Sequence, residues 1–174
     1  MQNKIYTHNA PYRILGIDPG TATTGFGIID CGLGQIYDTV DYGVIKTEPH
    51  LSDSKRLKII NQSLDEIIEK FNPNIVAVEK LFFFRNTTTI ITVAQSRGVV
   101  LLNMELKNIP LFEFTPLQVK QALTGYGKAS KKQMQEMVMK SLNLKSIPKP
   151  DDAADGLALA ICCQSSLSYL LKTK

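Results

Sequence analysis

The chain has 174 residues, of which 44% are hydrophobic and 21% are charged, with a formal net charge of +4 at pH 7. This length and composition suit one globular domain, and the absence of a signal peptide or a long apolar run predicts a cytoplasmic protein with no membrane span. Three cysteines without C-x-x-C spacing and only two histidines make a zinc site unexpected and favour a reducing compartment.

The first 46 residues predict a loose tail followed by three strands. The polar tail covers residues 1–11. Arg13–Asp18 is an apolar run that a Pro-Gly pair ends, and Gly25–Asp30 and about Gln35–Ile45 are further strands joined by Gly-rich turns. Consecutive strands with short turns favour an antiparallel meander.

Helices and strands alternate in the rest of the chain. Apolar residues three and four apart predict an amphipathic helix over Ser52–Phe71, and Asn74–Val78 is an apolar strand of the kind buried in parallel sheets. The remaining predicted elements are a long helix over Asn86 to about Lys107, a strand at Leu111–Phe114, helices at Pro116–Leu123 and Ser130–Leu142, and a closing helix from Asp151. This order predicts one α/β domain over residues 12–174, with a mixed five-stranded sheet flanked by helices.

Four acidic residues are attached to otherwise apolar elements. Asp18 ends the first strand and Glu79 follows the fourth, and functional groups of α/β sheets collect at the carboxyl ends of strands. In the last helix Asp152 and Asp155 are three residues apart and Asp151 and Asp155 are four apart, so at least one of these pairs shares a face. Each acid also has a structural alternative, as a turn former, a solvated side chain or a helix cap.

A carboxylate cluster without histidine or cysteine selects hard divalent cations, Mg²⁺ or Mn²⁺. Two such ions about 3.5 to 4 Å apart can activate a water and stabilise the leaving oxygen of a phosphodiester. Residues 115–150 add seven lysines against the single acid Glu136. Such a block is either a solvated face or a surface that binds phosphates. The two features together indicate metal-dependent phosphodiester chemistry.

Five segments, in this order, resemble the RuvC family of Holliday junction resolvases over roughly residues 13–165. They are ILGIDPGTATTGFGIID, VAVEKLFFFRN, AQSRGVV, VKQALTGYGKASKKQ and DDAADGLALA. The resemblance implies an RNase H-like fold and an Mg²⁺-dependent endodeoxyribonuclease that resolves four-way DNA junctions by paired symmetric nicks, in recombination and repair. It also implies two metal ions per active site, with Mn²⁺ as an alternative. Docking of a branch-migration complex of the RuvA and RuvB kind is left open.

The same resemblance assigns roles to individual residues. The catalytic, metal-binding carboxylates fall on Asp18, Glu79, Asp152 and Asp155, whereas Asp151 is a cap or lies behind the metal ligands. The DNA-contacting residues fall on Phe82, Lys120 and Lys131, with Lys128 and Lys132 as further candidates. Phe82 would lie beside the junction centre, and its alternative role is packing in the core or in a dimer interface.

The family's homodimer has a candidate interface in this chain. A four-way junction offers two equivalent strands, so one active site per chain can cut both only in a two-fold symmetric pair. The helix from Asn86 to Lys107 carries Ala94, Ser96 and Gly98 among apolar residues, and we expect it to form the contact.

Three other interpretations remain open at this point. GIDPGTATTG also resembles the first phosphate loop of actin-like and sugar-kinase ATP-binding proteins, although 174 residues hold only one of the two domains that those proteins use. A DNA-binding module that lacks catalysis is the second alternative. The third is another RNase H-like nuclease that acts on RNA or on other branched DNA.

Overall fold

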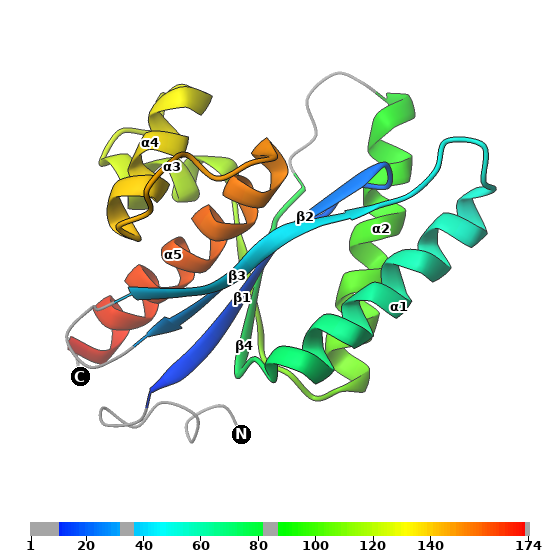
Figure 1. Cartoon of the computed structure of the whole chain (residues 1–174), viewed down its shortest axis with the longest axis horizontal. Coiled ribbons are helices and arrows are strands. Elements are labelled where there is room, and N and C mark those ends of the chain that lie inside the picture. Colours follow the sequence, from blue (N-terminus) through cyan, green and yellow to red (C-terminus); the bar gives the residue numbers. More distant parts are fainter. Residues whose placement is uncertain (1–10, 32–36, 82–86, 173–174) are drawn as a thin grey trace.

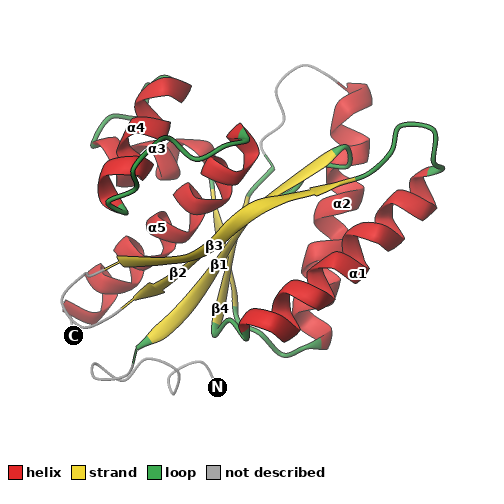
Figure 2. Cartoon of the chain, in the orientation of Figure 1, coloured by secondary structure: helices red, strands yellow, loops and turns green. Residues whose placement is uncertain are grey.

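The computed structural model describes residues 11–31, 37–81 and 87–172, which form a sheet between two layers of helices (Figure 2). The strands are β1 (Tyr12–Asp18), β2 (Thr23–Cys31), β3 (Tyr37–Lys46), β4 (Ile75–Glu79) and β5 (Leu111–Phe114). The helices are α1 (Asp53–Phe71), α2 (Thr87–Leu106), α3 (Pro116–Thr124), α4 (Lys131–Ser141) and α5 (Asp151–Lys172). None of these helices, over the residues described, is long and apolar enough to cross a membrane. The elements and their order are those predicted from periodicity.

The sheet has five strands in the order β3-β2-β1-β4-β5. β1, β2 and β3 pair antiparallel, whereas β4 lies parallel to both β1 and β5. This confirms the predicted mixed sheet. Ile17 of β1 pairs with Val78 of β4, so the next residues along, Asp18 and Glu79, emerge at the same edge of the sheet.

Both faces of the sheet are covered, which explains the uninterrupted apolar runs of β1 and β4. Figure 1 shows α1 and α2 against one face, and α5 against the other with α3 and α4 beyond it. Successive side chains alternate between the layers, because Leu15 and Ile17 pack with the α1 and α2 side chains whereas Ile14 packs with α5. β1 therefore contributes buried side chains to the apolar core on each face of the sheet.

α5 lies close to the sheet because glycines occupy the contact. They are Gly16, Gly25 and Gly27 on β1 and β2 and Gly156 on α5, and we call these four residues the glycine seat. A methyl group at Gly16 would meet the Gly156 carbonyl oxygen at 2.0 Å, and one at Gly25 would meet the Asp152 carbonyl oxygen at 1.9 Å. Gly25 is also the register partner of Asp18. The seat therefore sets the first turn of α5 directly beside the end of β1.

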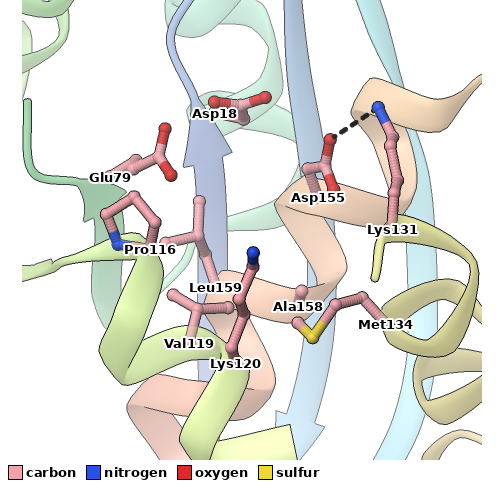
Figure 3. A pocket seen from close by; sticks show the side chains of 10 residues that line it. All are labelled: Asp18, Glu79, Pro116, Val119, Lys120, Lys131, Met134, Asp155, Ala158 and Leu159. Carbon is pink, nitrogen blue, oxygen red and sulfur yellow. Dashed lines mark ion pairs between the residues drawn. The ribbon is translucent and has the colours of Figure 1, made fainter. Parts of the chain in front are cut away.

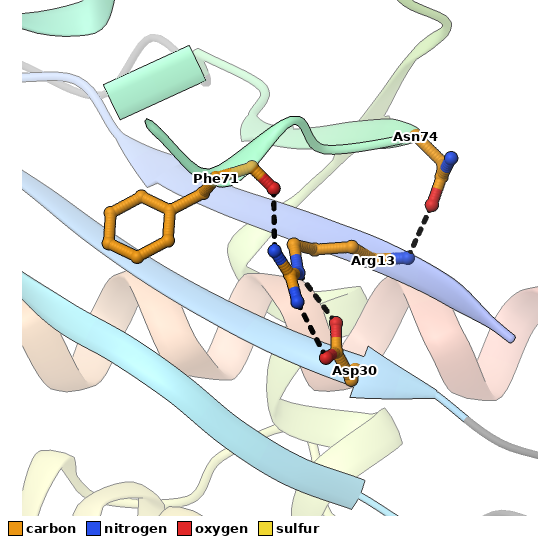
Figure 4. A network of polar contacts seen from close by, with 4 residues as sticks. All are labelled: Arg13, Asp30, Phe71 and Asn74. Carbon is orange, nitrogen blue, oxygen red and sulfur yellow. Dashed lines mark hydrogen bonds and ion pairs between the residues drawn. The ribbon is translucent and has the colours of Figure 1, made fainter. Parts of the chain in front are cut away.

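At the opposite end of β1, Arg13 joins three segments of the chain (Figure 4). Its guanidinium binds Asp30 of β2 in a bidentate pair, with N–O distances of 2.6 and 2.8 Å, and donates to the carbonyl of Phe71 at 2.6 Å. Its backbone N–H donates to Oδ1 of Asn74 at 2.7 Å. These contacts fix the end of α1 and the start of β4 against β1, which keeps β1 and β4 in register up to their acidic ends.

Candidate active site

A cavity of about 280 Å³ opens where β1 and β4 end, between α3, α4 and α5 (Figure 3). Its polar lining residues are Asp18, Glu79, Lys120, Lys131 and Asp155, and its apolar lining residues are Pro116, Val119, Met134, Ala158 and Leu159. Figure 3 shows the ammonium group of Lys120 pointing into the space between the acids. Five separate elements thus bring three carboxylates and two ammonium groups to one place.

Asp18 and Glu79 share a low-dielectric environment at the sheet edge. Burial raises the pKa of Asp18 to about 7, with help from the negative charges of Glu79, Asp155 and Asp152 and against the positive charge of Lys131. Burial and the Asp155 charge also raise the pKa of Glu79, and a hydrogen bond from Asp18 opposes that rise. Carboxylates brought this close repel one another unless a cation or a proton lies among them.

Asp155 is the acid of α5 that lines the cavity, and Lys131 is its counter-ion. The Lys131 Nζ atom lies 3.4 Å from Asp155 Oδ2 and 3.5 Å from Asp151 Oδ2. Burial raises the pKa of Asp155, and the pairing with Lys131 opposes this rise. Asp152 is not among the lining residues, but its charge is close enough to raise the pKa of both Asp18 and Asp155.

The donor set fits a hard divalent cation, because it consists of carboxylates and contains neither histidine nor cysteine. Within the described residues, however, no three His, Cys, Asp or Glu side chains are gathered closely enough to hold a metal ion as they stand. Lys131 provides positive charge next to Asp155, one of the three acids that line the cavity.

α2 supports both acid-bearing strands through contacts that the sequence did not reveal. Arg97 donates from Nε to the carbonyl of Glu79 at 3.3 Å, while its Nη2 lies 2.7 Å from Oε1 of Glu113 on β5. Thr21, in the turn after Asp18, donates to the carbonyl of Thr92 at 2.5 Å. The ends of β1 and β4 are therefore held by the same helix. Arg97 lies in the AQSRGVV segment, but nothing in that segment shows what its side chain contacts.

The other predicted site residues lie outside this cavity or outside the described structure. Lys128 and Lys132 are exposed, and neither is among the residues that line the cavity. Phe82 falls in residues 82–86, outside the described residues. The apolar wall that Val119 and Met134 form was not predicted as part of the site.

A sequence model of the family described as crossover junction endodeoxyribonuclease RuvC matches residues 14–163. The chain belongs to the RuvC family. A RuvC from Fusobacterium nucleatum is 53% identical over 159 residues, which cover 91% of this chain and 83% of that protein. A RuvC from Caldicellulosiruptor saccharolyticus is 48% identical over 159 residues, covering 91% and 96% of the two chains.

Solved structures agree with this assignment. The Thermus thermophilus RuvC in complex with a Holliday junction substrate superposes with a TM-score of 0.86 at 32% identity, covering 91% of this chain and 96% of that one. The yeast mitochondrial Holliday junction resolvase Ydc2, at 17% identity, has a TM-score of 0.70 over 98% of this chain and 83% of that one, a likeness of fold alone. The RNase H-like fold expected from the sequence is confirmed.

Proposed function

We propose that this RuvC family member resolves four-way DNA junctions by hydrolysing one phosphodiester in each of two opposite strands. The observation that carries the proposal is the cavity in which Asp18, Glu79 and Asp155 face Lys120 and Lys131. A relative from Thermus thermophilus has been solved with a Holliday junction substrate, which supports the same substrate here. Membership of a nuclease family favours this function over an actin-like ATP-binding protein or a DNA-binding module without catalysis.

Each group in the cavity has a role in the proposed reaction. The four acids Asp18, Glu79, Asp152 and Asp155 would hold two Mg²⁺ ions, with Mn²⁺ as an alternative. Bound metal supplies an activated water and stabilises charge on the leaving oxygen. Lys120 and Lys131 would bind the phosphate beside the scissile bond, and Lys128 and Lys132 would contact the backbone farther out. Phe82, three residues after Glu79, would stack beside the junction centre.

Synthetic DNA tests this function directly. With Mg²⁺, we expect paired symmetric nicks in a four-way junction and little cleavage of a linear duplex of the same sequence. Ca²⁺ should support binding without cleavage, because it accepts a looser coordination geometry than Mg²⁺. Equal cleavage of junction and duplex would instead indicate a nuclease of broader specificity. Junction binding without any cleavage would indicate a binding module.

The lysines of the cavity should contribute through the phosphate backbone. Lys120→Ala is expected to weaken junction binding and to make its salt dependence shallower by about 0.9 in log–log slope, since one phosphate contact is lost. Lys145→Ala is the matched control, because Lys145 is exposed and belongs to the same basic block but does not line the cavity. Binding titrations at several salt concentrations measure both. Equal slopes for Lys120→Ala and the unmodified protein would contradict the assignment.

We further propose that the protein dimerises through the outer face of α2. Ile91, Leu102 and Leu106 are 61%, 59% and 72% exposed. Ala94 and Gly98 are exposed between them at helical spacing, and a methyl group at Gly98 would meet no atom within 4 Å. This apolar stripe suits a second copy of the chain, because paired nicks require two active sites related by a two-fold axis.

The structure corrects one detail of the interface predicted from the sequence. Ser96 is buried, and its hydroxyl donates to the carbonyl of Val93 at 3.0 Å and to that of Thr92 at 3.3 Å. It therefore faces the sheet and not a partner. Ala94 and Gly98 are the small residues that remain in the proposed contact.

Leu102→Glu should prevent formation of the proposed dimer, because it places a charge within the apolar stripe. We expect a folded monomer that no longer makes paired nicks. Leu117→Glu is the control, since Leu117 is 54% exposed but lies on α3. Sedimentation velocity measures the oligomeric state, and a junction cleavage assay measures the pairing. A Leu102→Glu protein that stays dimeric would place the interface elsewhere.

A further inference from the structure

Lys131 is in contact with two carboxylates at once, and only one of them lines the cavity. Its Nζ atom is 3.4 Å from Asp155 and 3.5 Å from Asp151, and its side chain is 55% exposed. Asp151 and Asp155 are four residues apart on α5 and so occupy the same side of successive turns. Lys131 belongs to the first turn of α4, which places its side chain in the lining of the cavity.

We propose that Lys131 is an exchangeable counter-cation of the active site. It holds Asp155 while the site is free of metal, and it remains on Asp151 when Asp155 turns inward to a metal ion. This inference rests on the proposed function, because it takes Asp155 to be a metal ligand. Asp151 then has the role of a positioning residue that keeps Lys131 at the cavity.

Lys131 and a metal ion would compete for the Asp155 carboxylate. An ammonium group and a divalent cation are both attracted to Asp155 and repel each other, so each weakens the binding of the other to this carboxylate. Asp155 is paired with Lys131 through Oδ2, at 3.4 Å. A metal ion bound to Asp155 would therefore weaken this ion pair and favour its opening.

The ion pair between Lys131 and Asp155 costs little to open. The Asp155 side chain is 37% exposed and the Asp151 side chain 59% exposed, and ion pairs this accessible to water contribute little stability. Lysine carries three donors on a flexible four-carbon stem. A small rotation of the side chain can therefore move its ammonium group from Asp155 toward Asp151. Asp151 thus offers the ammonium an alternative partner within the same reach. The lysine stays beside the position where a scissile phosphate would bind.

Mn²⁺ binding in the absence of DNA tests this exchange, by calorimetry or by electron paramagnetic resonance. Lys131→Met should raise the Mn²⁺ affinity about fivefold, since the competing cation is gone, and Asp151→Asn should lower it about threefold. Lys132→Met is the matched control for charge alone, because Lys132 is the next residue along and is exposed. We expect it to change the affinity less than about twofold, since its charge is screened by solvent.

The double variant separates exchange from a general electrostatic effect. If Asp151 acts through Lys131, Asp151→Asn should have almost no effect on Mn²⁺ affinity in the Lys131→Met background. Additive effects of the two substitutions would overturn the proposal, as would equal effects of Lys131→Met and Lys132→Met.

Failure of the proposed function would appear differently in the same measurements. If Mn²⁺ binding is unchanged by Asp155→Asn and by Asp18→Asn, these acids do not form the metal site and the proposed function is contradicted. Binding that both substitutions abolish, but that Lys131→Met leaves unchanged, would reject only the exchange.

Discussion

Asp152→Asn is expected to abolish junction cleavage while leaving fold and junction binding intact. Asparagine caps helices about as well as aspartate, so the start of α5 keeps its stability. The amide is a neutral and poorer Mg²⁺ ligand, and we expect a loss of at least about 100-fold in rate, the upper end of what loss of an outer-shell partner costs. Single-turnover cleavage, junction binding in Ca²⁺ and thermal unfolding measure the three properties.

Asp151→Asn is the control for this prediction. Asp151 precedes Asp152 in the same first turn and pairs with Lys131 rather than lining the cavity. At saturating Mg²⁺ it should cut at nearly the normal rate. Normal cleavage by Asp152→Asn, with at most a small loss of stability, would reduce Asp152 to a helix cap. A dead Asp151→Asn beside an active Asp152→Asn would place the metal ligand at the neighbouring residue.

Gly16→Ala should strongly destabilise the contact between β1 and α5. The new Cβ would lie 2.0 Å from the Gly156 carbonyl oxygen and 2.7 Å from the Ala160 backbone nitrogen. Both are backbone atoms, so no side-chain rotation relieves the clash and α5 must move away from β1. We expect a loss of about 3 kcal/mol or more in the free energy of unfolding, at or above the upper end for overpacked cores, together with loss of cleavage.

Gly25→Ala keeps this prediction testable if the Gly16 variant does not fold. Its Cβ would meet the Asp152 carbonyl oxygen at 1.9 Å, at the start of α5, where the helix end can move without dragging the whole helix. We expect a folded protein with reduced metal affinity and slow cleavage. Chemical denaturation and metal titration distinguish the two effects. Native stability and full cleavage in both variants would show that α5 does not need its close approach.

Much of the site was predictable because it follows from local patterns. Apolar runs ending in Asp18 and Glu79 fix two parallel strands with acids at one edge, and helical spacing predicts that Asp155 shares a face of α5 with Asp151 or Asp152. Motif order then predicted roles for Lys120 and Lys131, and both side chains line the cavity. These features depend on residues close in sequence, where periodicity is informative.

The remaining features depend on segments that are far apart in the chain. The pairing of Lys131 with Asp151 and the contact of Gly16 with Gly156 exist only once α4 and α5 have packed. Ser96 was misplaced for another reason. Polar and apolar residues are spread around α2 without clear segregation, so the sequence pattern does not show which side faces the sheet.

Because α2 contacts the ends of both acidic strands, its position affects where the DNA is cut. Through Thr92 and Arg97 this helix holds the segments that carry Asp18 and Glu79, and its opposite face forms the proposed dimer contact. In the proposed dimer, one helix and its symmetry mate would set the distance between the two catalytic centres. A substitution that tilts α2 would move both centres by equal and opposite amounts. The two nicks would shift along their strands together and remain symmetric.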